Sequence, residues 1–183
     1  YTFDSNPNVK LNADSVAETR DYGTATMKDY KQAGMPQQAY SFGLEYRDPK
    51  FWWIGANVNY LADNYMDISP ILRTNNFYRN NDDPDGFPFA EATEERGREL
   101  LKQEKFDPMT LVNLVGGKSW RIKDKTIGFF ASINNVFDKE YITGGFEQAR
   151  NANFREINQD MAEPARSFGP KYFYGYGRTY FVY

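Results

Sequence analysis

Apolar and polar residues alternate with a period of two in several stretches of this chain, which is the pattern of a strand with one apolar and one polar face. The clearest stretch runs from Thr126 to Phe137, TIGFFASINNVF. It spans about a dozen residues, and at roughly 3.3 Å per residue such a strand can cross a bilayer at a tilt. Its apolar side carries Ile127, Phe129, Ala131, Ile133 and Phe137, and its polar or small side carries Gly128, Ser132 and Asn134.

Four further stretches repeat the alternation and are predicted as strands. The first pair, Gln38 to Arg47 and Phe51 to Asp63, is joined by the polar turn Asp48-Pro49-Lys50 and predicts a hairpin. A strand over Thr110 to Arg121 places Lys118 on its apolar side, and an aromatic strand is predicted over Lys171 to Tyr183. We expect residues 1–22 to be mostly loop and a short polar strand within Gly23 to Gly34.

The connections between these strands alternate between very short and very long. The turns at Asp48 to Lys50 and Lys123 to Lys125 are short, whereas residues 64–108 and 143–170 form long excursions. The first excursion is predicted to hold a surface helix over Glu94 to Glu104, capped by Thr93. Long loops at one end and short turns at the other are typical of an outer-membrane β-barrel. A soluble β-sandwich remains an alternative.

Five or six strands are too few to close a single-chain membrane barrel, which needs about eight. Because unpaired strand edges are not tolerated in lipid, we expect the chain to be part of a larger barrel. The predicted fold class is therefore all-β, an antiparallel transmembrane β-barrel segment with long outside loops.

Composition narrows the possible functions. Aromatic residues make up 17% of the 183 residues, and tyrosine and tryptophan favour membrane interfaces. The chain has no Cys and no His, so disulfides, thiolate metal sites and His-based acid-base catalysis are excluded. A net charge of -3 argues against nucleic-acid binding. The mean hydropathy of -0.75 excludes a helical membrane protein but does not separate a barrel from a soluble protein.

Several segments resemble the C-terminal barrel of TonB-dependent outer-membrane receptors, and the resemblance covers nearly the whole chain. It is closest to the group related to SusC-like transporters that carries a regulatory-like domain before the plug. The most specific segment is NNVFDKEY, residues 134–141, because N-x-F/L-D-x-x-Y recurs at the end of the penultimate strand in this family. Other segments that carry the resemblance are YSFGLEYRDPKFWWIGANVNYLADNY, LLKQEKFDPMTLVNLVGGKSW and FGPKYFYGYGRTYF.

The resemblance implies a barrel of about 22 strands around a plug, with residues 1–183 as the C-terminal part. The two short turns would face the periplasm and the two long loops the outside. The implied function is active nutrient import across the bacterial outer membrane, driven by the inner-membrane TonB complex. Membrane lipid and a surface lipoprotein of SusD type are the other implied partners. The sequence contains neither a TonB box nor a plug, and it lacks the terminal Phe expected of the family's last strand.

Candidate substrate-binding residues lie in two places. Asn57 and Asn59 belong to the predicted lumen face, where simple wall polarity facing water is the favoured explanation. Polar residues of the long loops are the other candidates, although such loops are polar by default. The loop candidates are Arg73, Asn75, Asn76 and Tyr78 in the first loop, and Arg150 and Asn153 in the second, with Asn151 and Arg155 beside them.

No catalytic constellation and no cofactor site is predicted, so we expect the protein not to be an enzyme. Asn81, Asp83, Asp85 and Gly86 resemble the first half of a calcium loop, but Ala92 stands where the bidentate Glu should fall, which favours a solvated turn. Two functions besides import stay open: a structural barrel in a surface assembly with lipoproteins, and a soluble binding module.

Overall fold

The computed structural model describes residues 2–12, 19–148 and 152–183. Strand exceeds helix (43% against 12%), and the paired strands whose direction is known are antiparallel, so the chain is all-β as predicted. The chain divides into two compact units. Unit 1 comprises Tyr1–Met35, Tyr65–Lys105 and Gly144–Tyr172, and unit 2 comprises Pro36–Asn64, Phe106–Thr143 and Phe173–Tyr183.

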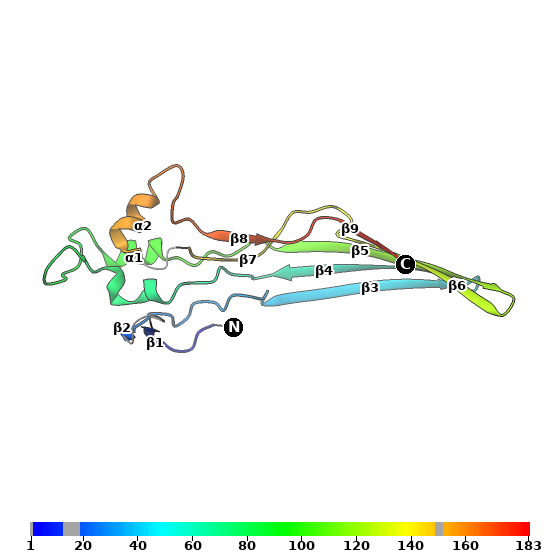
Figure 1. Cartoon of the computed structure of the whole chain (residues 1–183), viewed down its shortest axis with the longest axis horizontal. Helices are drawn as coiled ribbons and strands as arrows, with labels where there is room; N and C mark the ends of the chain where they lie inside the picture. Colours follow the sequence, from blue (N-terminus) through cyan, green and yellow to red (C-terminus); the bar gives the residue numbers. More distant parts are fainter. Residues whose placement is uncertain (1, 13–18, 149–151) are drawn as a thin grey trace. The chain divides into compact units, whose positions relative to one another are not determined.

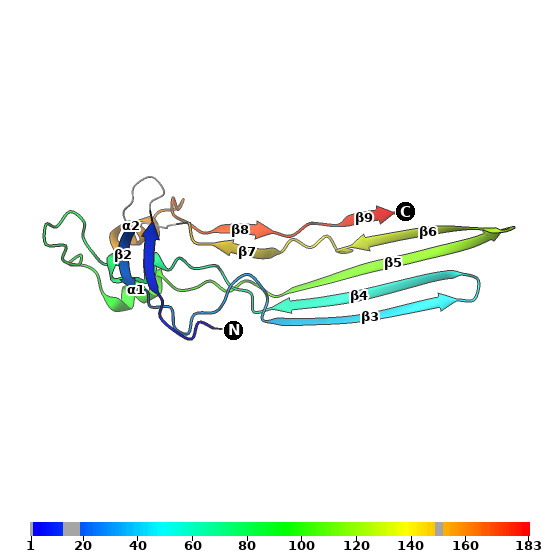
Figure 2. The ribbon, with the colours of Figure 1, turned by 60° about the horizontal axis from the view of Figure 1, so that its bottom comes forward.

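Unit 2 is built on an open five-stranded sheet in the order β3-β4-β5-β6-β9. Figures 1 and 2 show its long strands lying along one another, with the β3–β4 and β5–β6 turns at the same end. The short turns and long connections therefore alternate as the sequence predicted. The strands are β3 (Gln38–Asp48), β4 (Trp52–Ala62), β5 (Met109–Ile122), β6 (Lys125–Asn134) and β9 (Thr179–Val182).

The strand register confirms the predicted separation of faces. Tyr40 lies opposite Tyr60, Phe42 opposite Val58, and Leu44 opposite Ala56. Ala56 in turn pairs with Leu114, which pairs with Ile133. Because directly paired residues point to the same side of a sheet, the apolar rows of four strands form one continuous face. Lys118 also lies in this face, between Trp52 and Phe129, as predicted.

The opposite face of the sheet is polar, with one aromatic cluster. Gly43, Asn57 and Asn113 lie in one row of it, and Ser41 donates a hydrogen bond to Asn59 Oδ1 over 2.8 Å. Trp53, Phe130 and Phe181 form the cluster, with ring centroids 6.0 Å apart at each contact. The sequence pattern does not reveal this cluster, because Phe130 and Trp53 each follow an apolar residue that obscures the alternation.

Strand β6 ends before Phe137, earlier than predicted. Asn135 has a φ of 50° and is 4% exposed, so it leaves the ladder at a buried turn. Its amide donates to the Lys139 and Tyr176 carbonyls and accepts from the Lys139 backbone N–H. Asp138 and Tyr141 also contact residues 175–178, through the Arg178 and Gly175 backbone N–H groups. The segment NNVFDKEY thus fixes the chain that leads into β9.

The prediction of a single last strand over Lys171 to Tyr183 is wrong. This segment is divided into β8 (Lys171–Tyr174), which pairs with β7 (Ile142–Phe146), and β9, which pairs with β6. Two of the residues between them are Gly175 and Gly177, and each approaches the segment after β6 so closely that a Cβ atom would collide with Tyr141 or Asp138. Close backbone contact there replaces strand pairing.

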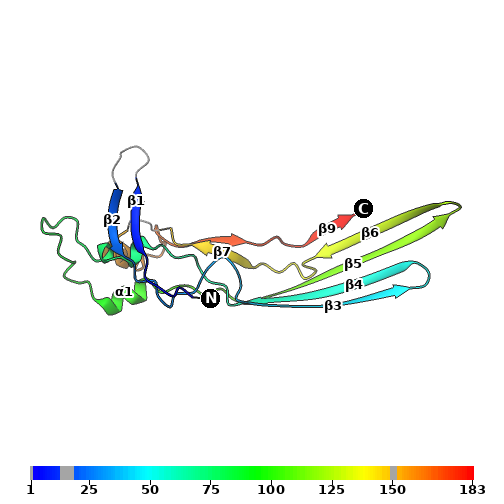
Figure 3. The same cartoon turned by 90° about the horizontal axis from the view of Figure 1, so that it is seen from below.

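Unit 1 contains a hairpin and two short helices. The hairpin pairs β1 (Asn8–Asn12) with β2 (Thr19–Thr24), and Figure 3 shows it clearly. Most of the polar strand predicted within Gly23 to Gly34 is absent from the described residues, because β2 ends at Thr24. Helix α1 (Glu94–Leu100) has the predicted Thr93 cap and ends before Glu104, whereas α2 (Phe154–Asp160) lies where only a loop was expected.

A small apolar core holds unit 1 together. Phe77 and Phe154 are each 1% exposed, and their rings meet edge to face with centroids 5.9 Å apart. The short 3-10 helices η1 (Ile71–Arg73) and η2 (Asn75–Phe77) supply Leu72 and Phe77 to this core. Its members are Leu72, Phe77, Phe89, Leu101, Ala152 and Phe154. In the part of the chain that the structure describes, no helix has the length and apolar character needed to span a membrane.

Candidate functional site

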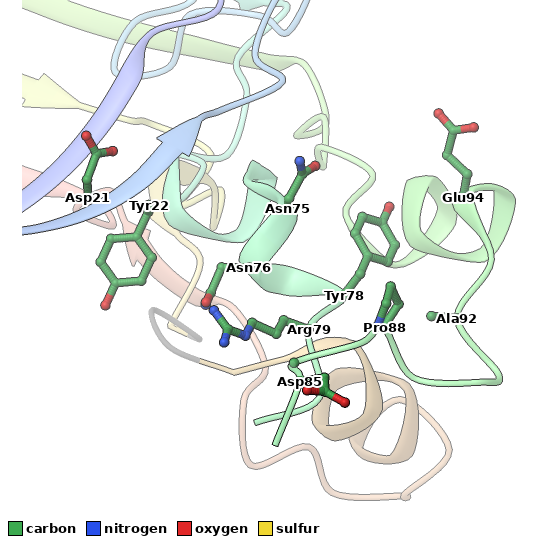
Figure 4. Close-up of a pocket in the computed structure, with 11 residues that line it drawn as sticks. Asp21, Tyr22, Asn75, Asn76, Tyr78, Arg79, Asp85, Pro88, Ala92 and Glu94 are labelled. Carbon is green, nitrogen blue, oxygen red and sulfur yellow. The ribbon is translucent and has the colours of Figure 1, made fainter. Parts of the chain in front are cut away.

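A polar pocket of about 750 Å³ lies in unit 1 (Figure 4). Its volume falls in the range of small-molecule sites, roughly 300–1,000 Å³. Strand β2, helix η2, the turn that follows it and the start of α1 supply the walls. The lining residues combine carboxylates, amides, phenols and one guanidinium: Asp21, Tyr22, Asn75, Asn76, Tyr78, Arg79, Asp85, Gly86, Pro88, Ala92 and Glu94.

A tight turn places Arg79 in this pocket. Backbone hydrogen bonds join Asn80 to Phe87 and Phe89 to Tyr78, so residues 78–89 fold back on themselves. Gly86 has a φ of 67°, which favours glycine, and a Cβ atom there would lie 2.6 Å from Arg79 Nη2. The Arg79 side chain therefore lies directly across the Gly86 backbone. Figure 4 shows its guanidinium pointing toward the Asn76 amide.

Tyr78 is positioned by the core and by α1. Its ring packs against Phe77 and Phe154, with centroids 5.1 Å and 6.0 Å away. The ring also lies against Gly97 of α1, where a Cβ atom would meet the phenol oxygen. Burial raises the pKa of the Tyr78 phenol, and the Glu94 carboxylate raises it further. The phenol therefore stays protonated.

The charged groups of the pocket differ in whether they already have partners. Asp21 accepts from the Gly23 backbone N–H and lies 3.4 Å from Lys10 Nζ. The pKa of the Asp21 carboxyl is lowered mainly by the Gly23 hydrogen bond. In contrast, no salt bridge joins Arg79, Asp85 or Glu94 to any residue that the structure describes. Charges of both signs are thus presented to solvent within one pocket.

Three of the loop residues predicted as substrate contacts meet in this pocket, namely Asn75, Asn76 and Tyr78. Arg73, predicted to point outward with them, does not. Its side chain is 1% exposed and donates to Glu147 Oε1 over 2.7 Å and to the Leu101 carbonyl over 2.9 Å. Arg73 is therefore a buried structural cation, because η1 turns it into unit 1.

The remaining predicted site residues lie elsewhere. Asn57 and Asn59 are on the polar face of the sheet, and Asn57 borders a hollow of about 420 Å³ with Gly55 and Asn113. Asn153 caps α2, accepting from the Glu156 backbone N–H in a capping box. Arg155 lies beside it and pairs with Glu91 over 2.7 Å. Arg150 and Asn151 fall outside the described residues.

The residues that resembled a calcium loop form turns. Asn80 Oδ1 accepts from the Asp82 backbone N–H, and Asp83 Oδ1 accepts from the Asp85 backbone N–H. Among the described residues, no group of three or more acidic side chains is arranged to hold a metal ion. Asp85 instead lines the pocket.

Sequence reasoning missed four polar members of the pocket: Asp21, Tyr22, Arg79 and Glu94. Arg79 could have been found, because it directly precedes a run of turn residues, NNDDPDG, that had to fold back beside it. Asp21 and Tyr22 carried no comparable signal, since β2 lies more than fifty residues away from η2 in the sequence.

No protein-family model matches the chain, and no curated protein matches it significantly.

Proposed function

We propose that unit 2 is part of the wall of an outer-membrane β-barrel, and that the protein is an active importer of the TonB-dependent receptor class. The observation that supports this proposal is the apolar face of the five-stranded sheet. Large apolar side chains on it are exposed in the described chain, among them Phe42 (65%) and Leu44 (69%). A contiguous exposed apolar surface of this size marks an interaction with lipid or with another protein.

The order of side chains along this face favours lipid over a protein partner. At the loop end, Tyr40 and Tyr60 stack with centroids 6.3 Å apart, and at the turn end Tyr46 meets Trp52 at 5.4 Å. Only aliphatic and phenyl side chains lie on this face of β3 and β4 between the two bands: Phe42, Leu44, Ala56 and Val58. Membrane barrels carry an apolar band flanked by two aromatic girdles.

The distance between the bands is shorter than the apolar band of a membrane barrel, because a strand tilted by about 40° covers only about three quarters of its length in height. Tyr40 and Tyr46 lie on one strand six residues apart, which corresponds to about 20 Å along the strand. The band in membrane barrels is about 25 Å tall. The sheet's other face, with Asn57, Asn59 and Asn113, would then line the interior. Under this proposal the residues between β4 and β5, which supply most of the pocket, and the residues between β6 and β9 face the outside.

Adjacent tryptophans provide a sharp test. Trp52 lies on the apolar face and Trp53 on the polar face of the same strand. The three tryptophans are Trp52, Trp53 and Trp120, so three variants can each keep one and replace the others by phenylalanine. In bilayers of brominated lipid we expect strong fluorescence quenching of Trp52 and Trp120 and weak quenching of Trp53. Equal quenching of Trp52 and Trp53, or none, would contradict the membrane wall.

The transport part of the proposal needs a separate measurement. Cells that contain the protein are compared for uptake of labelled nutrients with and without an intact TonB complex. We expect uptake to require both the protein and an intact TonB complex. Co-purification of stoichiometric lipoprotein partners without any TonB-dependent uptake would instead favour a structural barrel in a surface assembly.

A further inference from the structure

We propose that the pocket of unit 1 binds a short peptide with free ends, whose carboxylate is held at Arg79 and whose ammonium group is held at Glu94. The role of this pocket as an importer's substrate site rests on the proposed function. The binding itself does not, and it is tested separately below.

The carboxylate end is assigned to Arg79, because no salt bridge joins its guanidinium to any residue that the structure describes. The side chain lies across Gly86, and Figure 4 shows the guanidinium directed at the Asn76 amide. A guanidinium binds a carboxylate through two parallel hydrogen bonds, which are about twice as strong as neutral ones. The Asn76 amide can donate a further hydrogen bond to the same group.

The ammonium end is assigned to Glu94, because Figure 4 shows the Glu94 and Asp85 carboxylates at opposite ends of the pocket, with Asp85 on the Arg79 side. Glu94 begins α1 and Asp85 ends the turn, and both carboxylates are exposed and without a salt bridge in the described chain. Figure 4 shows Glu94 on the far side of Tyr78 from the Arg79 guanidinium. The pocket therefore separates its cation from at least one of its anions, and a ligand that bridges them must carry both charges.

The charge balance argues against the other ligand classes. With Asp21 already paired to Lys10, one free cation faces two free carboxylates in the described pocket. A simple anion would meet net repulsion, and a simple cation would leave Arg79 without a partner. A neutral sugar could use the amides, the phenols and, through its hydroxyls, the charged groups, but it would neutralise neither charge. A peptide satisfies the charges, and its backbone amides match the donors and acceptors of Asn75 and Asn76.

The test is calorimetric titration of the detergent-solubilised protein with tetraalanine. The comparison ligands are N-acetylated tetraalanine, tetraalanine amide and the neutral sugar maltotetraose. We expect tetraalanine to bind, and each blocked end to weaken binding roughly tenfold or more, because blocking removes a hydrogen bond between two charged groups. Equal binding of the blocked peptides, tighter binding of maltotetraose, or no tetraalanine binding at millimolar concentration would overturn the proposal.

Matched variants locate the two ends. Arg79→Met should remove the difference between tetraalanine and its amide, and Glu94→Gln should reduce the difference between tetraalanine and its acetylated form. Glu95→Gln, on the same helix but outside the pocket, and Lys50→Met, in the β3–β4 turn, should change neither. Circular dichroism checks that each variant is folded. Failed peptide binding with normal tryptophan quenching would reject only this inference, and failed quenching with normal binding would reject only the membrane wall.

Discussion

Asp138 Oδ1 accepts a hydrogen bond from the backbone N–H of Arg178, 40 residues later, over 2.6 Å. The same carboxylate oxygen would lie 2.8 Å from a Cβ atom at Gly177. Asn135 binds the Tyr176 carbonyl from the same turn. These contacts give the segment NNVFDKEY a structural explanation: its polar residues hold the chain before β9 so that β9 meets β6 in register.

Asn135→Ala should lower the free energy of unfolding by about 2–3 kcal/mol. The substitution removes three side-chain hydrogen bonds at a buried position and places alanine at a positive φ. Chemical denaturation in detergent measures the change. Asn134→Ala is the matched control, because Asn134 is exposed and its amide donates one long hydrogen bond, 3.3 Å, to the Thr179 hydroxyl. If Asn134→Ala lowers the free energy of unfolding as much as Asn135→Ala does, the role assigned to Asn135 is contradicted.

Gly175→Ala should destabilise the same region, because its Cβ atom would collide with the Tyr141 ring. Replacing Tyr141 by alanine removes the obstacle. We therefore expect the double variant Gly175→Ala, Tyr141→Ala to be more stable than the sum of the single effects predicts. A double-mutant cycle on unfolding free energies measures this coupling, and strict additivity would show that the two residues do not meet.

Leu44→Arg should destabilise the protein in bilayers by about 2–4 kcal/mol if the apolar face meets the middle of the membrane. Leu44 lies in the row of Ala56, Leu114 and Ile133, between the two aromatic bands. Asn57→Arg, on the opposite face one position along β4, should be tolerated to within about 0.5 kcal/mol. Reversible folding into lipid vesicles under urea measures the free energy of unfolding of both variants. An equal loss in Leu44→Arg and Asn57→Arg would contradict the assignment of the two faces.

Arg73→Met and Arg79→Met should separate a structural arginine from a binding one. The first leaves Glu147 without its buried partner, and we expect a loss of about 3–5 kcal/mol in the stability of unit 1. The second removes an exposed side chain and should leave stability nearly unchanged. Thermal unfolding followed by circular dichroism compares the two variants. A similar loss in both would contradict the distinction.

The Glu91–Arg155 contact predicts a dependence on pH. The hydrogen bond from Arg155 lowers the pKa of the Glu91 carboxyl below its usual 4.5. A lowered pKa in the folded state stabilises the fold above the unfolded pKa, and this stabilisation is lost as the pH falls from about 4.5 through the folded pKa. Carboxyl NMR should show Glu91 titrating below the usual value and returning to it in Arg155→Met. An unchanged Glu91 titration in that variant would exclude the contact in solution.

Much of the sheet could be predicted from sequence because its strands are two-faced. Tyr40, Phe42, Leu44 and Tyr46 alternate so regularly with polar neighbours that both the strand and its apolar face follow. The divided end of the chain could not be predicted. Residues 171–183 alternate almost as well, but the break depends on how closely Gly175 and Gly177 approach Tyr141 and Asp138, which are distant in sequence.

The pocket was harder to predict than the sheet, because its walls come from segments without periodicity. Asn75, Asn76 and Tyr78 were expected to bind ligand only because they are polar loop residues, and that reasoning included Arg73 equally. The two arginines differ in tertiary contacts alone: Glu147 receives Arg73, and Gly86 leaves room for Arg79. Local sequence does not encode either contact.

The ladder between β4 and β5 ends at the pair Trp52 and Lys118, yet β5 and β6 continue together to Ile122 and Lys125. Strand β5 of the β5–β6 hairpin therefore extends four residues, or about 13 Å, beyond its last pair with β4. If both turns lie at one membrane surface, the strands must lean steeply away from the membrane normal. This offset between neighbouring hairpins is then the register stagger that a sheet needs to close into a barrel.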